Sequence, residues 1–404
     1  MTPAAAVRSL VRTAGWGGRG RRAGPRDRAR SAVLTGFALA AAANLGLAAV
    51  VETRRPEWRD PEYFHRQKQL TRLVRGDRGQ GHARPLVVVL GGSRPQMGLS
   101  PDHLGLGGGP TDPRVFSLTQ SGTVPAGARL NAARLFASGI SPDFVLVEVL
   151  PPVLTDPDLA RHPVPTGRLG CADLAAALPY HSHSVGSWVV ARAAPLSSLR
   201  VPLVAHARLA DVLPPGPARS DFLWTDMRPT GWSPFYPAAW TAADWVPRLA
   251  VAREAYTRRL AREGVRPEHD RAVRDTLADC RARGIRAALF TMPESAGFRT
   301  AYPPGRRELL LAHVAALGRE CGVPVFDTSA WVFREIEFMD GHHLLGPAAE
   351  RFSARFGREC VGPPFAALGR GSPRHAGRGR GPRSGAGRRR CSRRCSGWRR
   401  RSRR

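Results

Sequence analysis

Two short segments that lie far apart in the sequence carry side chains capable of nucleophilic catalysis together. The first is Gly91-Gly92-Ser93 and the second is Asp340-Gly341-His342-His343. A serine hydroxyl becomes an effective nucleophile when a neighbouring base takes its proton, and a carboxylate that orients the base completes the arrangement. The residue types therefore predict Ser93 as nucleophile, His343 as base and Asp340 as the orienting acid.

The three-residue spacing decides between the two adjacent histidines. Consecutive side chains point in different directions, so His342 and His343 cannot both face Ser93 in the same way. An offset of three brings the Asp340 carboxylate within reach of Nδ1 of His343, which leaves Nε2 for the serine proton. We expect His342 to pack or form hydrogen bonds at the rim of the site.

Five short apolar runs predict the strands that must position these residues, at 86–90, 115–118, 144–149, 287–291 and 324–327. Amphipathic segments between most of them predict helices. The alternation favours an α/β fold with a doubly wound, flavodoxin-like parallel sheet of about five strands and helices on both faces. Ser93 follows the first run, so it lies at the carboxyl edge, where such sheets bind ligands. The insertion 152–266 is expected to form a helical lid over that edge.

An apolar segment precedes this region. Residues 31–51 carry no charge and are long enough to cross a bilayer as one helix, after the arginine-rich segment 1–30. By the positive-inside rule, the N-terminus is cytoplasmic and the main domain extracytoplasmic, which makes a single-pass membrane protein. A cleaved signal peptide and a buried helix of a soluble protein are the alternatives. Residues 52–84 are expected to be a juxtamembrane linker with a helix around 61–74, and residues 85–365 the main domain.

The formal net charge of +30 is concentrated at the two ends of the chain. Residues 1–30 and 366–404 are rich in arginine, and the part between them is only mildly basic. The tail 366–404 has almost no apolar content and is predicted to be disordered. It is non-functional sequence, an adhesive basic tail or a nucleic-acid-binding segment. Because lysine is nearly absent while arginine abounds, coding bias accounts for the charge, and an RNA- or DNA-binding protein is the weakest interpretation.

Six cysteines are widely scattered, without the paired spacing of a zinc site. We therefore expect no metal and no organic cofactor. Outside the cytoplasm, one or two disulfides can form, and the sequence does not fix their pairing.

The motifs resemble those of the SGNH or GDSL hydrolases, especially the membrane-anchored extracytoplasmic branch associated with acylation of cell-surface polymers. The resemblance covers roughly residues 85–360, with a gap over the insertion. The first family block corresponds to Gly91-Gly92-Ser93, the second to Ser121-Gly122 and the last to Asp340-Gly341-His342-His343. The resemblance implies that the backbone N–H groups of Ser93 and Gly122 bind the oxyanion.

One family block is missing. Where the family has Gly-x-Asn-Asp after the third strand, this chain has Val147-Glu148-Val149-Leu150. An asparagine donor to the oxyanion is therefore absent at that place, and losing one such donor typically costs about 10²- to 10³-fold in rate. Either another group replaces it, or the protein is slow, a transferase or inactive.

Four further side chains are candidates for substrate binding, namely Arg94, Glu148, Glu294 and His342. The plainer interpretation makes them surface or helix-entry charges and a packing residue. The sequence predicts a serine esterase or O-acyltransferase that acts on ester-linked acyl groups, above all acetyl groups of cell-surface polysaccharide. The alternative, which the missing block favours, is a catalytically silent scaffold that binds polysaccharide or a membrane acylation partner. The expected partners are an acylated carbohydrate or other ester, the membrane through one helix, and a membrane acyltransferase.

Overall fold

The structure is a computed structural model that describes residues 24–79, 84–106, 112–161, 164–180, 185–193, 227–262 and 264–363. Residues 1–23 and the arginine-rich tail 366–404 lie outside the described residues, so the expectation of a disordered tail falls outside them too.

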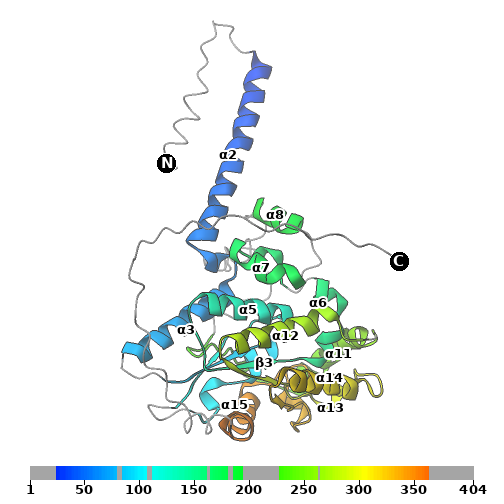
Figure 1. The fold of residues 1–404 in the computed structure, drawn as a ribbon. Coiled ribbons are helices and arrows are strands. Elements are labelled where there is room, and N and C mark those ends of the chain that lie inside the picture. The colour runs from blue at the N-terminus through cyan, green and yellow to red at the C-terminus, as the bar shows by residue number, and fades with distance from the viewer. Residues whose placement is uncertain are drawn as a thin grey trace, which may run out of the picture. The chain divides into compact units, whose positions relative to one another are not determined.

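A five-stranded parallel sheet forms the centre of the fold (Figure 1). Its strands are β1 (Leu86–Leu90), β2 (Arg114–Ser117), β3 (Phe144–Glu148), β4 (Arg286–Phe290) and β5 (Val325–Phe326). Their spatial order is β2-β1-β3-β4-β5, and every neighbouring pair is parallel. The strands coincide with the five apolar runs to within one residue at each end, as expected for runs buried on both faces. The predicted flavodoxin-like sheet is confirmed.

Helices cover both faces of this sheet. On one face, Val88 and Val145 share a core with Leu135 of α5 (Pro125–Ala137) and Leu277 of α12 (Pro267–Ala282). Helix α14 (Arg306–Cys321) adds Val314 and Leu317 to that core. On the other face, the ring of Phe356 in α15 (Gly346–Phe356) lies 5.4 Å from the ring of Phe290. Figure 1 shows α5 and α12 on the opposite side of the strands from α15.

The helix predicted around 61–74 is present within the expected linker 52–84, but it belongs to the folded domain. Helix α3 (Pro61–Gly79) places Tyr63 and Leu70 in the same core as β1. The Arg66 side chain is fully buried and donates to the backbone oxygen of Gly231 at 3.1 Å. The linker expectation is therefore corrected: charged residues dominate the sequence of α3, but its apolar face helps to close the core.

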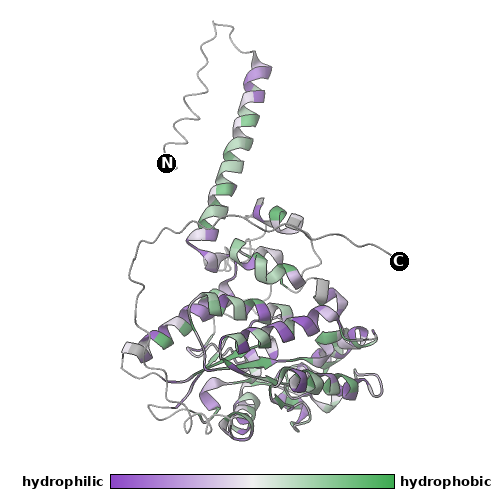
Figure 2. Ribbon diagram, in the orientation of Figure 1, coloured by the Kyte–Doolittle hydropathy of each residue, from purple (hydrophilic) through white to green (hydrophobic). Residues whose placement is uncertain are grey.

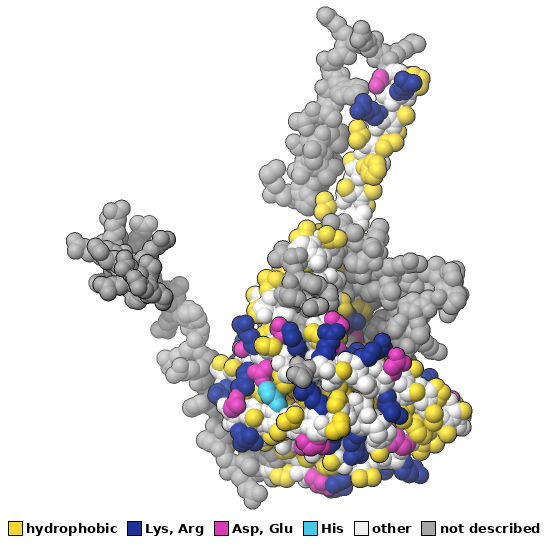
Figure 3. All heavy atoms as spheres, turned by 90° about the vertical axis from the view of Figure 1, so that its right-hand side faces the viewer, with side chains coloured by type: hydrophobic (Ala, Val, Ile, Leu, Met, Phe, Trp, Pro, Cys, Tyr) yellow, Lys and Arg dark blue, Asp and Glu magenta, His cyan; other side chains and the backbone are white. Residues whose placement is uncertain are grey.

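Helix α2 (Pro25–Thr53) is long and apolar enough to cross a membrane. It is longer than the expected 31–51 and begins with a turn that contains charged residues. Figure 2 colours most of α2 as hydrophobic, and Figure 3 shows hydrophobic side chains along α2 with charged ones gathered at its amino end. Val33 and Phe37 are 57% and 71% exposed, which argues against the core helix of a soluble protein.

The insertion 152–266 is divided between two places. Residues of η3 (Pro151–Thr155), α6 (Pro157–Arg161) and α11 (Ala242–Leu260) line a pocket at the carboxyl edge of the sheet, as the lid prediction requires. In contrast, α7 (Leu174–Ala177) packs on α5, and α8 (Val185–Ala193) contacts α2. Residues 194–226 of the insertion lie outside the described residues.

Candidate active site

Ser93 is the first residue of α4 (Ser93–Gly98) and follows β1 through a sharp turn. The turn needs its two glycines because other chain segments approach it closely. A Cβ atom on Gly91 would lie 2.7 Å from Cβ of Glu148, and one on Gly92 would lie 2.9 Å from the backbone oxygen of Thr123. The N–H of a first helical residue has no partner within its own helix, so that of Ser93 is available to a ligand.

Asp340 and His343 lie on a tight turn that follows η9 (Glu335–Glu337). The N–H of Met339 donates to the oxygen of His343 at 2.8 Å, and Gly341 supplies the positive φ of 92° that the turn requires. The backbone N–H groups of His342 and His343 donate hydrogen bonds to Oδ1 of Asp340, at 3.3 and 3.1 Å. The backbone of the turn therefore holds the Asp340 carboxylate in place independently of its side-chain contacts.

The structure brings Ser93, His343 and Asp340 into one hydrogen-bonded chain. Nε2 of His343 lies 2.7 Å from Oγ of Ser93, and Nδ1 of His343 lies 2.8 Å from Oδ2 of Asp340. Burial opposes ionisation of Asp340, but His342 and His343 outweigh it and hold the pKa of this carboxyl well below its usual value. An ionised Asp340 keeps the proton of His343 on Nδ1, so Nε2 can accept the proton of Ser93.

His342 packs in an aromatic cluster rather than at the rim of the site. Its ring stacks on Phe298 with 4.7 Å between ring centroids, and the hydroxyl of Tyr256 lies 3.4 Å from its Nε2. Burial lowers the pKa of His342 to about 4, so the ring is neutral at pH 7. His342 is absent from the pocket lining, which corrects its candidacy for substrate binding.

Arg94 is buried and cross-links the loops of the site. Its guanidinium donates to the backbone oxygens of Met292 and Pro293 at 2.6 and 2.8 Å, and to that of His342 at 3.2 Å. These contacts tie the helix of Ser93 to the turn of His343. Arg94 lines the inner wall of the pocket, but its Nε and Nη2 donate to protein backbone oxygens, so it positions the two catalytic segments. Its Nη1 has no hydrogen-bond partner among the described residues and lies 3.8 Å from Oε1 of Glu294.

Glu294 is buried inside the protein and does not line the pocket. It accepts a hydrogen bond from the hydroxyl of Tyr302 at 2.7 Å, and its Oε1 lies 3.8 Å from Nη1 of Arg94. Its role is to support Arg94, which corrects the expectation of substrate binding. Glu148, in contrast, lies in the pocket beside Ser93, where its Oε2 accepts a hydrogen bond from the N–H of Gly92 at 2.9 Å.

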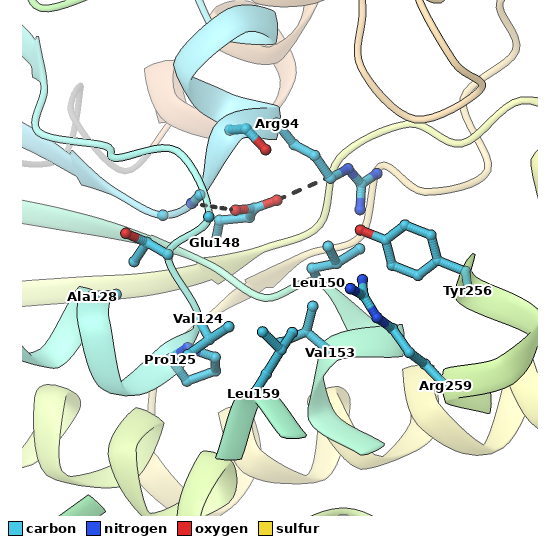
Figure 4. Close-up of a pocket in the computed structure, with 15 residues that line it drawn as sticks. Arg94, Val124, Pro125, Ala128, Glu148, Leu150, Val153, Leu159, Tyr256 and Arg259 are labelled. Atoms are coloured by element: carbon cyan, nitrogen blue, oxygen red, sulfur yellow. Dashed lines mark hydrogen bonds and ion pairs between the residues drawn. The ribbon is translucent and has the colours of Figure 1, made fainter. Parts of the chain in front are cut away.

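A pocket of about 140 Å³ opens beside Ser93. Its floor carries Ser93 and Gly122, the two residues expected to bind the oxyanion, and Gly122 adopts the positive φ of 69° that favours glycine. Apolar side chains form most of its wall, and Figure 4 shows Val124, Pro125, Leu150, Val153 and Leu159 around it. Tyr256 and Arg259 of α11 close one side (Figure 4).

Asp340, His342 and His343 also meet the distance requirement of a metal site. One ligand atom from each lies within 4.8 Å of the others. However, both nitrogens of His343 are engaged, one with Ser93 and one with Asp340, so a metal would have to break this chain. The donor set therefore fits a catalytic triad better than a metal centre. The described cysteines, Cys171, Cys280, Cys321 and Cys360, are all free thiols.

Sequence patterns did not identify Tyr256, Arg259 or Val153 as pocket residues. Tyr256 and Arg259 belong to the predicted helical lid at 152–266, but no periodicity says which face of their helix lines the pocket. Only the position of the insertion, directly after the third strand, indicated that some of its side chains would reach the carboxyl edge of the sheet.

Comparisons with known proteins add little to this geometry. No protein-family model matches the chain, and no curated protein matches it in sequence. Among solved structures, the chain is similar to the lipase/acylhydrolase from Enterococcus faecalis, with 14% sequence identity and a TM-score of 0.32. That match covers 69% of this chain and 96% of the other. So distant a likeness says nothing about function.

Proposed function

We propose that the protein is a serine hydrolase of the SGNH type that cleaves or transfers an ester-linked acyl group. The observation that carries this proposal is the unbroken chain from Oγ of Ser93 through His343 to Asp340, with distances of 2.7 and 2.8 Å. Residues from two distant segments meet there in the order that activates a serine. A silent scaffold has no need for such geometry next to an open pocket.

The reaction follows from these contacts. Oγ of Ser93 attacks the carbonyl carbon of the ester, and its proton moves to Nε2 of His343. The negative charge that develops on the carbonyl oxygen is stabilised by the N–H groups of Ser93 and Gly122. Collapse of this intermediate breaks the ester C–O bond, and His343 returns the proton to the leaving alcohol. Water or an acceptor hydroxyl then attacks the acyl-serine, with His343 again taking and returning a proton.

We infer that the pocket receives an acyl group of a few carbons. Its volume of about 140 Å³ is close to that of a protein cavity known to hold benzene. Because its wall is mostly apolar, a short acyl chain such as acetyl is the substrate that fits it best. We infer that α2 anchors the domain outside the cytoplasm, because arginines lie on the amino side of this helix. An acetylated cell-surface polysaccharide is then a substrate within reach.

Hydrolysis of p-nitrophenyl esters by the full-length protein in detergent tests the proposal. We expect turnover of the acetyl ester, a lower kcat/KM for the decanoyl ester, and loss of both activities in Ser93→Ala. Equal turnover by the wild type and Ser93→Ala would disprove the serine mechanism. A preference for the decanoyl ester would disprove the assignment of the acyl pocket.

A further inference from the structure

Glu148 ends β3 and stands in the wall of the pocket next to Ser93. Its side chain is 4% exposed, and Figure 4 shows it between the turn that precedes Ser93 and the guanidinium of Arg94. The mechanism described above does not use it. A carboxylate in this place would repel the negative charge that develops on the substrate oxygen, so its protonation state decides whether it helps or opposes catalysis.

The two oxygens of Glu148 have different surroundings. Oε2 accepts the hydrogen bond from the N–H of Gly92 at 2.9 Å. Oε1 is buried and has no hydrogen-bond partner among the described residues, and Nε of Arg94 lies 4.0 Å from it. A buried acceptor without a partner is costly. In a neutral carboxylic acid, Oε2 is the carbonyl oxygen and Oε1 carries the proton. Oε1 then becomes a donor that has no acceptor among the described residues and can donate to a ligand in the pocket.

The charges around Glu148 do not restore the ionised form. Burial raises the pKa of the Glu148 carboxyl, and Arg94, the N–H of Gly92 and His343 offset this only in part. Arg94 also faces Glu294 on its other side, at 3.8 Å. Tyr256 and Arg259 reach the same pocket from α11. A carboxylic acid that its site keeps neutral can serve as an oxyanion donor.

We propose that Glu148, as a neutral acid, is the third donor of the oxyanion hole, with its Oε1–H directed at the substrate oxygen. This inference rests on the proposed function and supplies the donor that the missing asparagine leaves vacant. No proton is transferred to the substrate oxygen: the hydrogen bond strengthens as negative charge builds up and weakens as the intermediate collapses. Ionisation of Glu148 replaces a donor by a like charge, so kcat/KM falls on the alkaline side of its titration.

Three variants of the full-length protein in detergent test this role by the pH profile of p-nitrophenyl acetate hydrolysis. Glu148→Met removes the donor, and we expect kcat to fall by about 10²- to 10³-fold. Glu148→Gln keeps a neutral donor, so it should recover most of that loss and abolish the alkaline decline seen in the wild type. Glu294→Gln changes the other carboxyl beside Arg94 and should keep the decline.

The outcomes separate this inference from the proposed function. An activity in Glu148→Met within about tenfold of the wild type, or the same alkaline decline in the wild type and Glu148→Gln, would overturn the donor role. Should Glu148→Met not fold, the Glu148→Gln profile alone decides. An infrared difference spectrum between the wild type and Glu148→Gln at neutral pH should show the carbonyl band of a protonated carboxyl, and its absence would also overturn the inference. If Ser93→Ala is as active as the wild type, the proposed function itself fails.

Discussion

Replacing the two adjacent histidines one at a time separates catalysis from packing. His343→Ala removes the ring whose Nε2 lies 2.7 Å from Oγ of Ser93 and whose Nδ1 lies 2.8 Å from Asp340. Without that base, the serine proton has no acceptor in the site. Members of a triad act as a unit, so we expect kcat to fall by at least about 10³-fold, which corresponds to about 4 kcal/mol of transition-state stabilisation.

His342→Ala should affect stability more than rate. The ring is 5% exposed and stacks on Phe298, so its truncation leaves a cavity and lowers the free energy of unfolding by about 2 to 4 kcal/mol. The variant loses the contact of 3.1 Å between Nδ1 of His342 and Oδ1 of Asp340. Asp340 nevertheless keeps its backbone hydrogen bonds from residues 342 and 343, and its Oδ2 still holds Nδ1 of His343. We therefore expect kcat per folded molecule to fall by less than about tenfold. His342→Phe refills the cavity and serves as the matched control.

The assay combines p-nitrophenyl acetate turnover with urea unfolding of the same preparations. The expected pattern is an inactive, stable His343→Ala and an active, less stable His342→Ala. A larger loss of kcat in His342→Phe than in His343→Ala would refute the assignment of the base, because only one of the two rings contacts Ser93.

Three further predictions follow from buried contacts. Arg134→Met should lower the free energy of unfolding by about 3 to 5 kcal/mol in a denaturant titration, because Arg134 contacts the buried carboxylates of Asp60 and Asp173 at 2.7 and 2.8 Å; a change below about 1 kcal/mol would contradict this. The pKa of His342 falls to about 4 in the folded protein, so only the unfolded chain gains this proton between pH 6.5 and 4. Stability should therefore decrease by up to about 3 kcal/mol as the pH falls through this window, and His342→Phe should flatten the slope of unfolding free energy against pH. Gly91→Ala should lower kcat by about 10²-fold in the esterase assay, because its Cβ would displace the turn that carries Ser93, and an unchanged kcat would show that the turn tolerates the shift.

The sheet and the triad were predictable because both depend on short patterns. Buried parallel strands are continuous apolar runs, so 86–90 and 144–149 stood out, and the offset of three between Asp340 and His343 fixed which histidine pairs with the acid. The structure places these residues as that spacing requires.

Long-range contacts were not predictable in the same way. The charged sequence of α3 indicated a helix within a linker, because nothing local shows that Arg66 is buried against Gly231 in a distant part of the chain. Arg94 next to the nucleophile was a candidate for substrate binding for the same reason, since its partners Met292 and Pro293 follow the end of β4. A single sequence states which residues are polar, but not which distant backbone oxygens will satisfy them.

Covalent labelling of Ser93 tests the central claim most directly. The full-length protein in detergent is treated with a fluorophosphonate, and intact mass and peptide mapping locate the adduct. The account predicts one adduct per chain, on Ser93, and its loss in Ser93→Ala and His343→Ala. An unlabelled wild type, or a His343→Ala variant labelled as fast as the wild type, would show that His343 does not activate Ser93.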